Sequence, residues 1–111
     1  MRVRAFLKPF VEAGVVSAGV LRDVLLVAGE LLSNALRHAT GPYRFSVFVA
    51  VGGVTVAVRD RSHTLPREAD SPAEAGGYGL QIVRRLTGGV RTVRHSDGKT
   101  VVATVPLSAS D

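Results

Sequence analysis

The sequence predicts an α+β domain in which helices cover one face of an antiparallel sheet. One observation is the order of hydrophobic periods along the chain, which runs helical, alternating, helical, alternating. Another is a pair of glycine-containing turns, at Gly52-Gly53 and Asp97-Gly98, each flanked by alternating segments. With 111 residues, 46% of them hydrophobic, residues 1–111 are expected to form a single domain with one core.

The N-terminal segment predicts a helix. Its apolar residues have the i, i+3, i+4 spacing of one helical stripe: Val3, Phe6, Leu7, Phe10 and Val11. Pro9 interrupts this stripe, because proline has no backbone N–H and kinks or breaks a helix interior. Two shorter helical pieces are therefore an alternative to one helix.

A longer helix is predicted from Leu21 to Ala39, where Thr40-Gly41-Pro42 ends it. At about 100° per residue, with Glu30 at zero, Asn34 lies near 40° and His38 near 80°. The Leu and Ala side chains fill an arc from about 100° to 240°, which is the predicted buried face. Two interpretations stay open. The polar stripe is the solvent face of the helix, or its carboxylate, amide and imidazole serve as a base, a magnesium ligand and a phosphate contact.

The first hairpin is predicted by alternating apolar residues on both sides of Gly52-Gly53. Counting outward from this turn pairs Val51 with Val54, Val49 with Val56 and Val47 with Val58, which places all six valines on one face. Asp60 directly follows the second strand. A carboxylate at that place can accept a hydrogen bond from the exocyclic amine of a base.

A long loop, a short helix and a second hairpin complete the predicted order. The segment 61–76 contains Pro, Ser, charge and no sustained period, which is typical of a loop. A helix over 80–86 and strands over 90–96 and 99–106 follow, the strands turning at Asp97-Gly98. Gly77 and Gly79 precede the helix, where free N–H groups and the helix dipole favour an anion.

The composition limits the classes of function. The net charge is +5 and twelve of the fourteen basic residues are Arg, but these are scattered along the chain, so a solvated basic surface is favoured over a nucleic-acid interface. The chain has no Cys, and no apolar stretch approaches the roughly 18 residues of a membrane span. We therefore expect a soluble cytoplasmic domain.

Gly98-Lys99-Thr100 resembles the end of a P-loop, but Val93 replaces the required first glycine and a strand follows.

Four motifs, taken in order, resemble the ATP-binding domain of the GHKL (Bergerat-type) ATPase/kinase superfamily, and most closely its bacterial anti-sigma-factor serine kinases. The matching segments are Glu30-Leu31-Leu32-Ser33-Asn34-Ala35 with His38-Ala39, then Asp60, then Gly77-Tyr78-Gly79-Leu80, then Gly98-Lys99-Thr100. The resemblance covers nearly the whole chain. It implies a two-layer α/β sandwich with a mixed, mostly antiparallel sheet covered on one face by helices.

The resemblance also implies roles for individual residues. Asn34 would ligate Mg²⁺ that bridges the phosphates of ATP, and Glu30 would be the catalytic base. Asp60 would bind the adenine amine, with Thr100 supporting that contact. The remaining cofactor-binding residues would be His38 on the long helix and Gly77, Gly79 and Leu80 around the phosphates.

The implied function is that of a protein serine kinase and anti-sigma factor, with ATP, a sigma factor and a STAS-type antagonist as partners. Ser62 and Thr64 depart from the family pattern, because they occupy positions that are usually glycine. The strand that usually precedes the first helix is also missing. Either the sheet is one strand short, with its edge left to pair with a second copy in a homodimer, or the start of the sequence is truncated. A non-catalytic ATP-gated binding module is the main alternative, and an Arg-rich nucleic-acid binder is the outsider.

Overall fold

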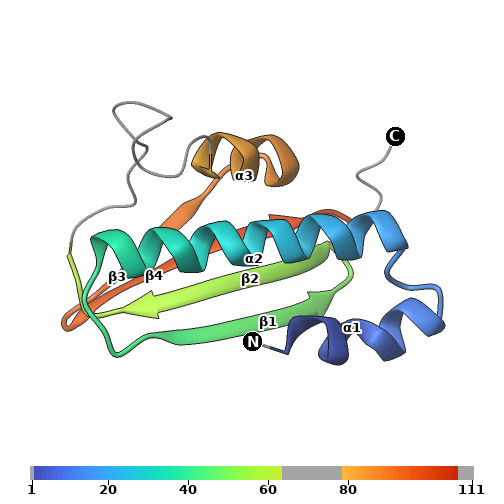
Figure 1. Cartoon of the computed structure of the whole chain (residues 1–111), viewed down its shortest axis with the longest axis horizontal. Helices are drawn as coiled ribbons and strands as arrows, with labels where there is room; N and C mark the ends of the chain where they lie inside the picture. Colours follow the sequence, from blue (N-terminus) through green and yellow to red (C-terminus); the bar gives the residue numbers. More distant parts are fainter. Residues whose placement is uncertain (1, 64–78, 108–111) are drawn as a thin grey trace.

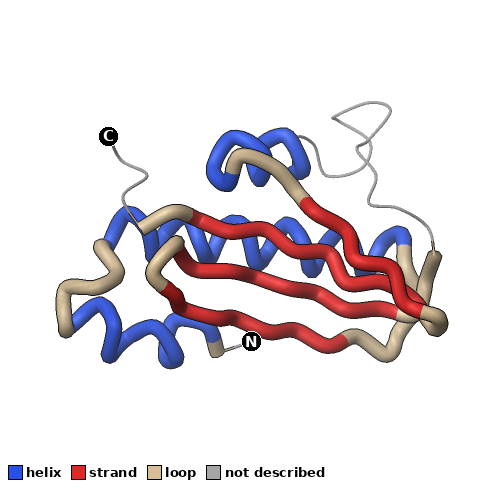
Figure 2. The backbone as a smooth tube through the Cα atoms, turned by 180° about the vertical axis from the view of Figure 1, so that it is seen from behind, coloured by secondary structure: helices blue, strands red, loops and turns tan. Residues whose placement is uncertain are grey.

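The computed structural model describes residues 2–63 and 79–107 of the chain. Its elements, in chain order, are α1 (Val3–Glu12), α2 (Ala18–His38), β1 (Arg44–Ala50), β2 (Gly53–Asp60), α3 (Gly79–Thr87), β3 (Arg91–His95) and β4 (Gly98–Val105). The strands form one antiparallel sheet in the order β1-β2-β4-β3. The helices cover one face (Figure 1) and leave the other face open (Figure 2). The predicted α+β fold is confirmed, although the described sheet is wholly antiparallel rather than mixed.

The helix α1 is one continuous helix that contains Pro9. The missing proline N–H would have bonded to Ala5, so one helical hydrogen bond is lost. The Pro9 carbonyl still accepts a bond from Ala13 N–H at 3.0 Å. Val3 and Leu7 on the apolar stripe are buried, and α1 packs against α2. The alternative of two helical pieces is therefore wrong, because tertiary packing holds the stripe together across the proline.

The helix α2 begins three residues earlier than predicted and ends at His38. Ser17 caps its start, since its Oγ accepts a hydrogen bond of 3.1 Å from Val20 N–H. At the other end, the Tyr43 hydroxyl donates to the Ala39 carbonyl at 2.9 Å. The serine is an ordinary N-cap signal that a prediction based on apolar spacing alone did not use.

The buried face of α2 is rotated from the predicted one. Its buried residues are Val20, Val24, Val27, Ala28, Leu31 and Ala35. These residues span an arc from about 60° to 160° on the same helical wheel, whereas the predicted arc ran from about 100° to 240°. Leu36, placed on the predicted face, is 59% exposed. The core boundary has therefore moved toward the stripe that carries Asn34 and His38.

Both hairpins pair two residues away from the predicted register. Val49 lies opposite Val54, and His95 lies opposite Gly98, so the two-residue turns are Val51-Gly52 and Ser96-Asp97. The glycine begins the second strand in each case. Gly98 has a φ of 152°, and a Cβ on it would collide with the Asp60 carbonyl, so only glycine fits there. Because the side-chain period is two, the shift leaves the buried face of β2 unchanged.

The hydrophobic core lies between the sheet and α2. The inner faces of β2 and β4 contribute buried valines and an alanine to it: Val54, Val56, Val58, Val101, Ala103 and Val105. Leu80 and Val83 of α3 close the core beside α2. Within residues 2–63 and 79–107, no helix has the length and hydropathy that a membrane span requires.

Replacing Leu7 by Ala is expected to lower the free energy of unfolding by about 2–5 kcal/mol, because the side chain is fully buried and its loss leaves a cavity. Urea denaturation measures this change. The matched control is Leu36→Ala, which shortens the same residue type at an exposed position and should alter stability by less than about 0.5 kcal/mol. Equal losses in the two variants would contradict the described position of α1.

Candidate functional site

The polar stripe of α2 is not a fully exposed face, and one of its residues lies against α3. Glu30, Asn34 and His38 are each half-buried, and α3 packs beside α2. A Cβ built on Gly79, the first residue of α3, would collide with the Glu30 carboxylate and lie 3.2 Å from Glu30 Cδ. The structure therefore brings Glu30 and Gly79, which are 49 positions apart in the sequence, into direct contact.

The start of α3 is a favourable place for negative charge. Its first backbone N–H groups have no acceptor within the helix, and the helix dipole places partial positive charge there. No acidic residue lies in the first turn of α3, so Glu30 of α2 supplies a carboxylate from outside the helix. This end of α3 thus combines a carboxylate with backbone donors suited to an anion.

Leu80 fixes α3 rather than presenting its side chain to a ligand. It is only 4% exposed and belongs to the core, so the group available to a phosphate is its backbone N–H. This refines the predicted cofactor-binding role of Leu80. Gly77, which was predicted to bind the phosphates, lies outside the described residues.

Asn34 is one helical turn from Glu30 on the same stripe. Within residues 2–63 and 79–107, no group of three or more His, Asp or Glu side chains could hold a metal ion without other ligands. An amide oxygen such as that of Asn34 suits Mg²⁺, which usually takes few protein ligands and completes its shell with phosphate oxygens and water. His38 lies one further turn along, at the end of α2.

Asp60 forms a buried ion pair with Lys99, and the two residues lie directly opposite each other across β2 and β4. Lys99 Nζ donates to Asp60 Oδ1 at 3.0 Å and to Oδ2 at 2.9 Å. Ser62 N–H donates to Oδ1 at 2.8 Å, and the Ser62 carbonyl lies 3.5 Å from Nζ. Asp60 and Lys99 are 2% and 3% exposed, so this network is almost completely shielded from water.

Lys99 is the functional candidate that the sequence interpretation missed. It appeared there only as the middle residue of Gly98-Lys99-Thr100. The charge of Lys99 and its place in an alternating strand were visible signals, but its partner depends on which strand lies beside β2 and in which register. Neither could be fixed from one sequence.

Thr100 does not support Asp60 in this structure. Alternation along β4 places it on the face opposite to Lys99, and its Oγ1 lies 2.7 Å from His95 Nε2. The predicted contact between Thr100 and Asp60 is therefore wrong, and Lys99 occupies the position assigned to it. The error comes from assigning one role to the shared motif, because adjacent residues of a strand point to opposite faces of the sheet.

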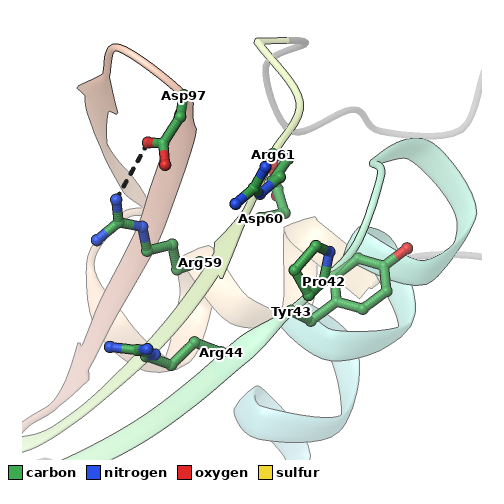
Figure 3. A pocket seen from close by; sticks show the side chains of 7 residues that line it. All are labelled: Pro42, Tyr43, Arg44, Arg59, Asp60, Arg61 and Asp97. Carbon is green, nitrogen blue, oxygen red and sulfur yellow. Dashed lines mark hydrogen bonds and ion pairs between the residues drawn. The ribbon is translucent and has the colours of Figure 1, made fainter.

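A shallow pocket of about 270 Å³ lies at the end of the sheet, beside β1 and β2 (Figure 3). Its lining residues are Pro42, Tyr43, Arg44, Arg59, Asp60, Arg61 and Asp97. Arg59 donates to Asp97 Oδ1 at 3.1 Å. This hydrogen bond is the main cause of the lowered pKa of the Asp97 carboxyl. Arg44 lies opposite Arg59 across the two strands, so the pocket rim carries concentrated positive charge.

Comparison with protein families matches residues 1–105 to the histidine kinase-like ATPase domain. The chain belongs to this family. Two solved structures are similar to this ATPase domain. One is the Erythrobacter litoralis EL346 blue-light activated histidine kinase, with 28% identity, a TM-score of 0.61, and coverage of 86% of this chain and 33% of that one. The other is the histidine kinase domain from the same protein, with 29% identity, a TM-score of 0.54, and coverage of 80% and 45%.

These comparisons confirm the predicted GHKL-type ATPase domain. Membership of the histidine kinase-like ATPase family supports ATP binding and a regulatory function. The ATPase domain spans about a third of the length of the first solved structure and under half of the second. No curated protein matches the chain.

Replacing Gly79 by Ala is expected to weaken ATP binding in the presence of Mg²⁺ by about tenfold, or about 1.4 kcal/mol. The added methyl group collides with the Glu30 carboxylate and stands beside the backbone N–H groups at the start of α3, so the backbone can no longer approach a phosphate closely. Isothermal titration calorimetry measures the affinity. Gly29→Ala is the matched control, because a Cβ at Gly29 meets nothing within 4 Å, and its affinity should equal that of the wild type. If Gly79→Ala bound ATP with wild-type affinity, the start of α3 would not be part of the ATP site.

Replacing Arg59 by Met is expected to raise the pKa of Asp97 toward its ordinary value, because the guanidinium donates the hydrogen bond that lowers it. NMR titration of the Asp97 carboxyl carbon measures the shift. Since the folded-state pKa is lowered, the stability from this pair is present above the unfolded pKa and is lost as pH falls through the folded one. An unchanged Asp97 titration in the variant would contradict the assigned cause.

Proposed function

We propose that this ATPase domain is an ATP-binding regulatory protein with protein serine kinase activity, and that it acts as an anti-sigma factor in the cytoplasm. The observation that carries the proposal is the Glu30 carboxylate at the start of α3, with Asn34 one turn away on α2. A base, an oxygen ligand and an anion-binding helix end thereby share one site. The proposed partners are ATP, a sigma factor and a STAS-type antagonist.

The roles of the residues follow from their chemistry. Glu30 takes the proton of a serine hydroxyl as that oxygen bonds to the γ-phosphorus, and the bond between this phosphorus and the leaving ADP oxygen breaks. Asn34 supplies an oxygen ligand for Mg²⁺, which neutralises phosphate charge when bound. The N–H groups at the start of α3 hold phosphate oxygens, with Gly77 and Gly79 permitting close approach of the backbone. His38 contributes a further phosphate contact from the end of α2.

A hydroxyl substrate fits this arrangement because a serine hydroxyl is weakly nucleophilic until a base removes its proton. The two similar solved structures are described as a histidine kinase and a histidine kinase domain, which supports phosphoryl transfer as the class of reaction. The serine acceptor rests on Glu30 and on the resemblance to anti-sigma-factor kinases.

The second candidate function is a non-catalytic ATP-gated protein-binding module. Ser62 and Thr64 favour it, because they depart from the family pattern at positions that are usually glycine. Such a module would still use Asn34 and Asp60 to bind ATP but would transfer no phosphate. The exposed edge strand β1 is where a second copy would pair in the homodimer that the sequence predicts.

Incubation with labelled ATP, Mg²⁺ and STAS-type antagonist proteins tests the kinase. Glu30→Gln is expected to lower transfer of label by at least about a hundredfold while ATP affinity stays within about threefold, because the variant removes a base but no phosphate ligand. Asn34→Ala is expected to lose Mg²⁺-dependent ATP binding itself.

The two variants separate the hypotheses. Transfer by the wild type that Glu30→Gln abolishes supports the kinase, and ATP binding without any transfer supports the module. Unchanged calorimetric binding by Asn34→Ala would show that the metal ligand has been assigned to the wrong residue.

A further inference from the structure

Nearly all hydrogen-bond donors and acceptors of the Asp60–Lys99 pair already have partners within the protein. Asp60 Oδ1 accepts from both Lys99 Nζ and Ser62 N–H, and Oδ2 accepts from Nζ. The three ammonium protons face Oδ1, Oδ2 and, at 3.5 Å, the Ser62 carbonyl. No buried polar side-chain atom in the described residues lacks a partner, so the pair is satisfied without a ligand.

A base amine must therefore compete with Lys99 for the Asp60 carboxylate. The Asp60 side chain is 1% exposed and the Lys99 side chain 4% exposed, so a ligand cannot reach the carboxylate unless the ammonium moves. A neutral amine is a weaker donor to a carboxylate than an ammonium, because charge-assisted hydrogen bonds between two ionised groups are stronger. Replacing the Lys99 ammonium by a base amine as the donor to Asp60 therefore adds nothing to the free energy of binding.

We propose that Lys99 determines base selectivity by holding Asp60, so that the site does not discriminate in favour of an amino-bearing purine. The inference rests on the proposed function, because it assumes that a nucleoside triphosphate binds beside α2. Affinity comes from the phosphate end, from Asn34 and the start of α3. The base end offers neither a free carboxylate oxygen that a base amine could donate to nor a bare carboxylate that would repel a purine carbonyl.

The test compares ATP with ITP, whose base carries a carbonyl in place of the amine. Calorimetry with Mg²⁺ is expected to give wild-type affinities for the two nucleotides within about threefold of each other. Lys99→Thr frees the carboxylate and keeps a small hydroxyl donor beside it, so ATP should then bind at least about tenfold more tightly than ITP.

Two matched controls separate the pair from general charge effects. Lys99→Arg keeps a cation that can bridge both carboxylate oxygens, so its ratio of ATP to ITP affinity should equal that of the wild type. Lys8→Thr removes the only other lysine of the sequence, an exposed residue of α1, with the same change in net charge. It should leave the ratio unchanged as well.

The wild-type ratio is decisive even where Lys99→Thr fails to fold because Asp60 loses its buried counter-ion. A wild-type preference for ATP above about tenfold overturns the proposal while leaving the nucleotide site intact. A folded Lys99→Thr protein that still fails to discriminate also overturns it. If neither the wild type nor any variant binds ATP or ITP, the proposed function fails and the inference fails with it.

Discussion

The rotation of α2 about its own axis is the constraint on which the rest of the structure depends. Its buried arc includes Val20 and Val27, so the helix packs against both the sheet and α3. That orientation turns Glu30 toward the start of α3 and leaves Asn34 half-buried one turn away. The same packing that buries Leu31 and Ala35 thereby half-buries the polar stripe. Stability and site geometry arise from one helix, since the centres of its apolar and polar faces are only about 70° apart.

Much of the fold could be predicted from periodicity, but the details that depend on neighbours could not. The helical and alternating apolar periods correctly predicted the type of each element and which face of β2 is buried. Pro9 was misjudged because tertiary contacts of Leu7 outweigh one missing hydrogen bond. Leu36 was placed in the core because a helical wheel does not show from which direction α3 arrives. Both hairpin registers were offset because Gly53 and Gly98 begin strands instead of occupying the turns.

Part of the candidate site could likewise be predicted from the sequence, and part could not. Glu30, Asn34 and Gly79 follow from local spacing and motif order, and the structure places Glu30 against Gly79. The base end required knowledge of strand order, because Asp60 meets Lys99 only where β2 pairs with β4. Alternation then excludes Thr100 from that contact. A motif of three consecutive residues on a strand thus serves two opposite faces of the sheet, and its outer members cannot be assigned the role of the central one.

The start of β4 has a consequence for how this chain tolerates change in length. Gly98 lies so close to the Asp60 carbonyl that no side chain fits between the strands, and Lys99 follows immediately with its buried charge. A single-residue insertion in the Ser96-Asp97 turn that slid β4 by one position would send that ammonium to the solvent-exposed face and bring Thr100 inward. Length variation among close relatives of this sequence should therefore accumulate at the Val51-Gly52 turn, which is distant from the ion pair, and be rare at Ser96-Asp97.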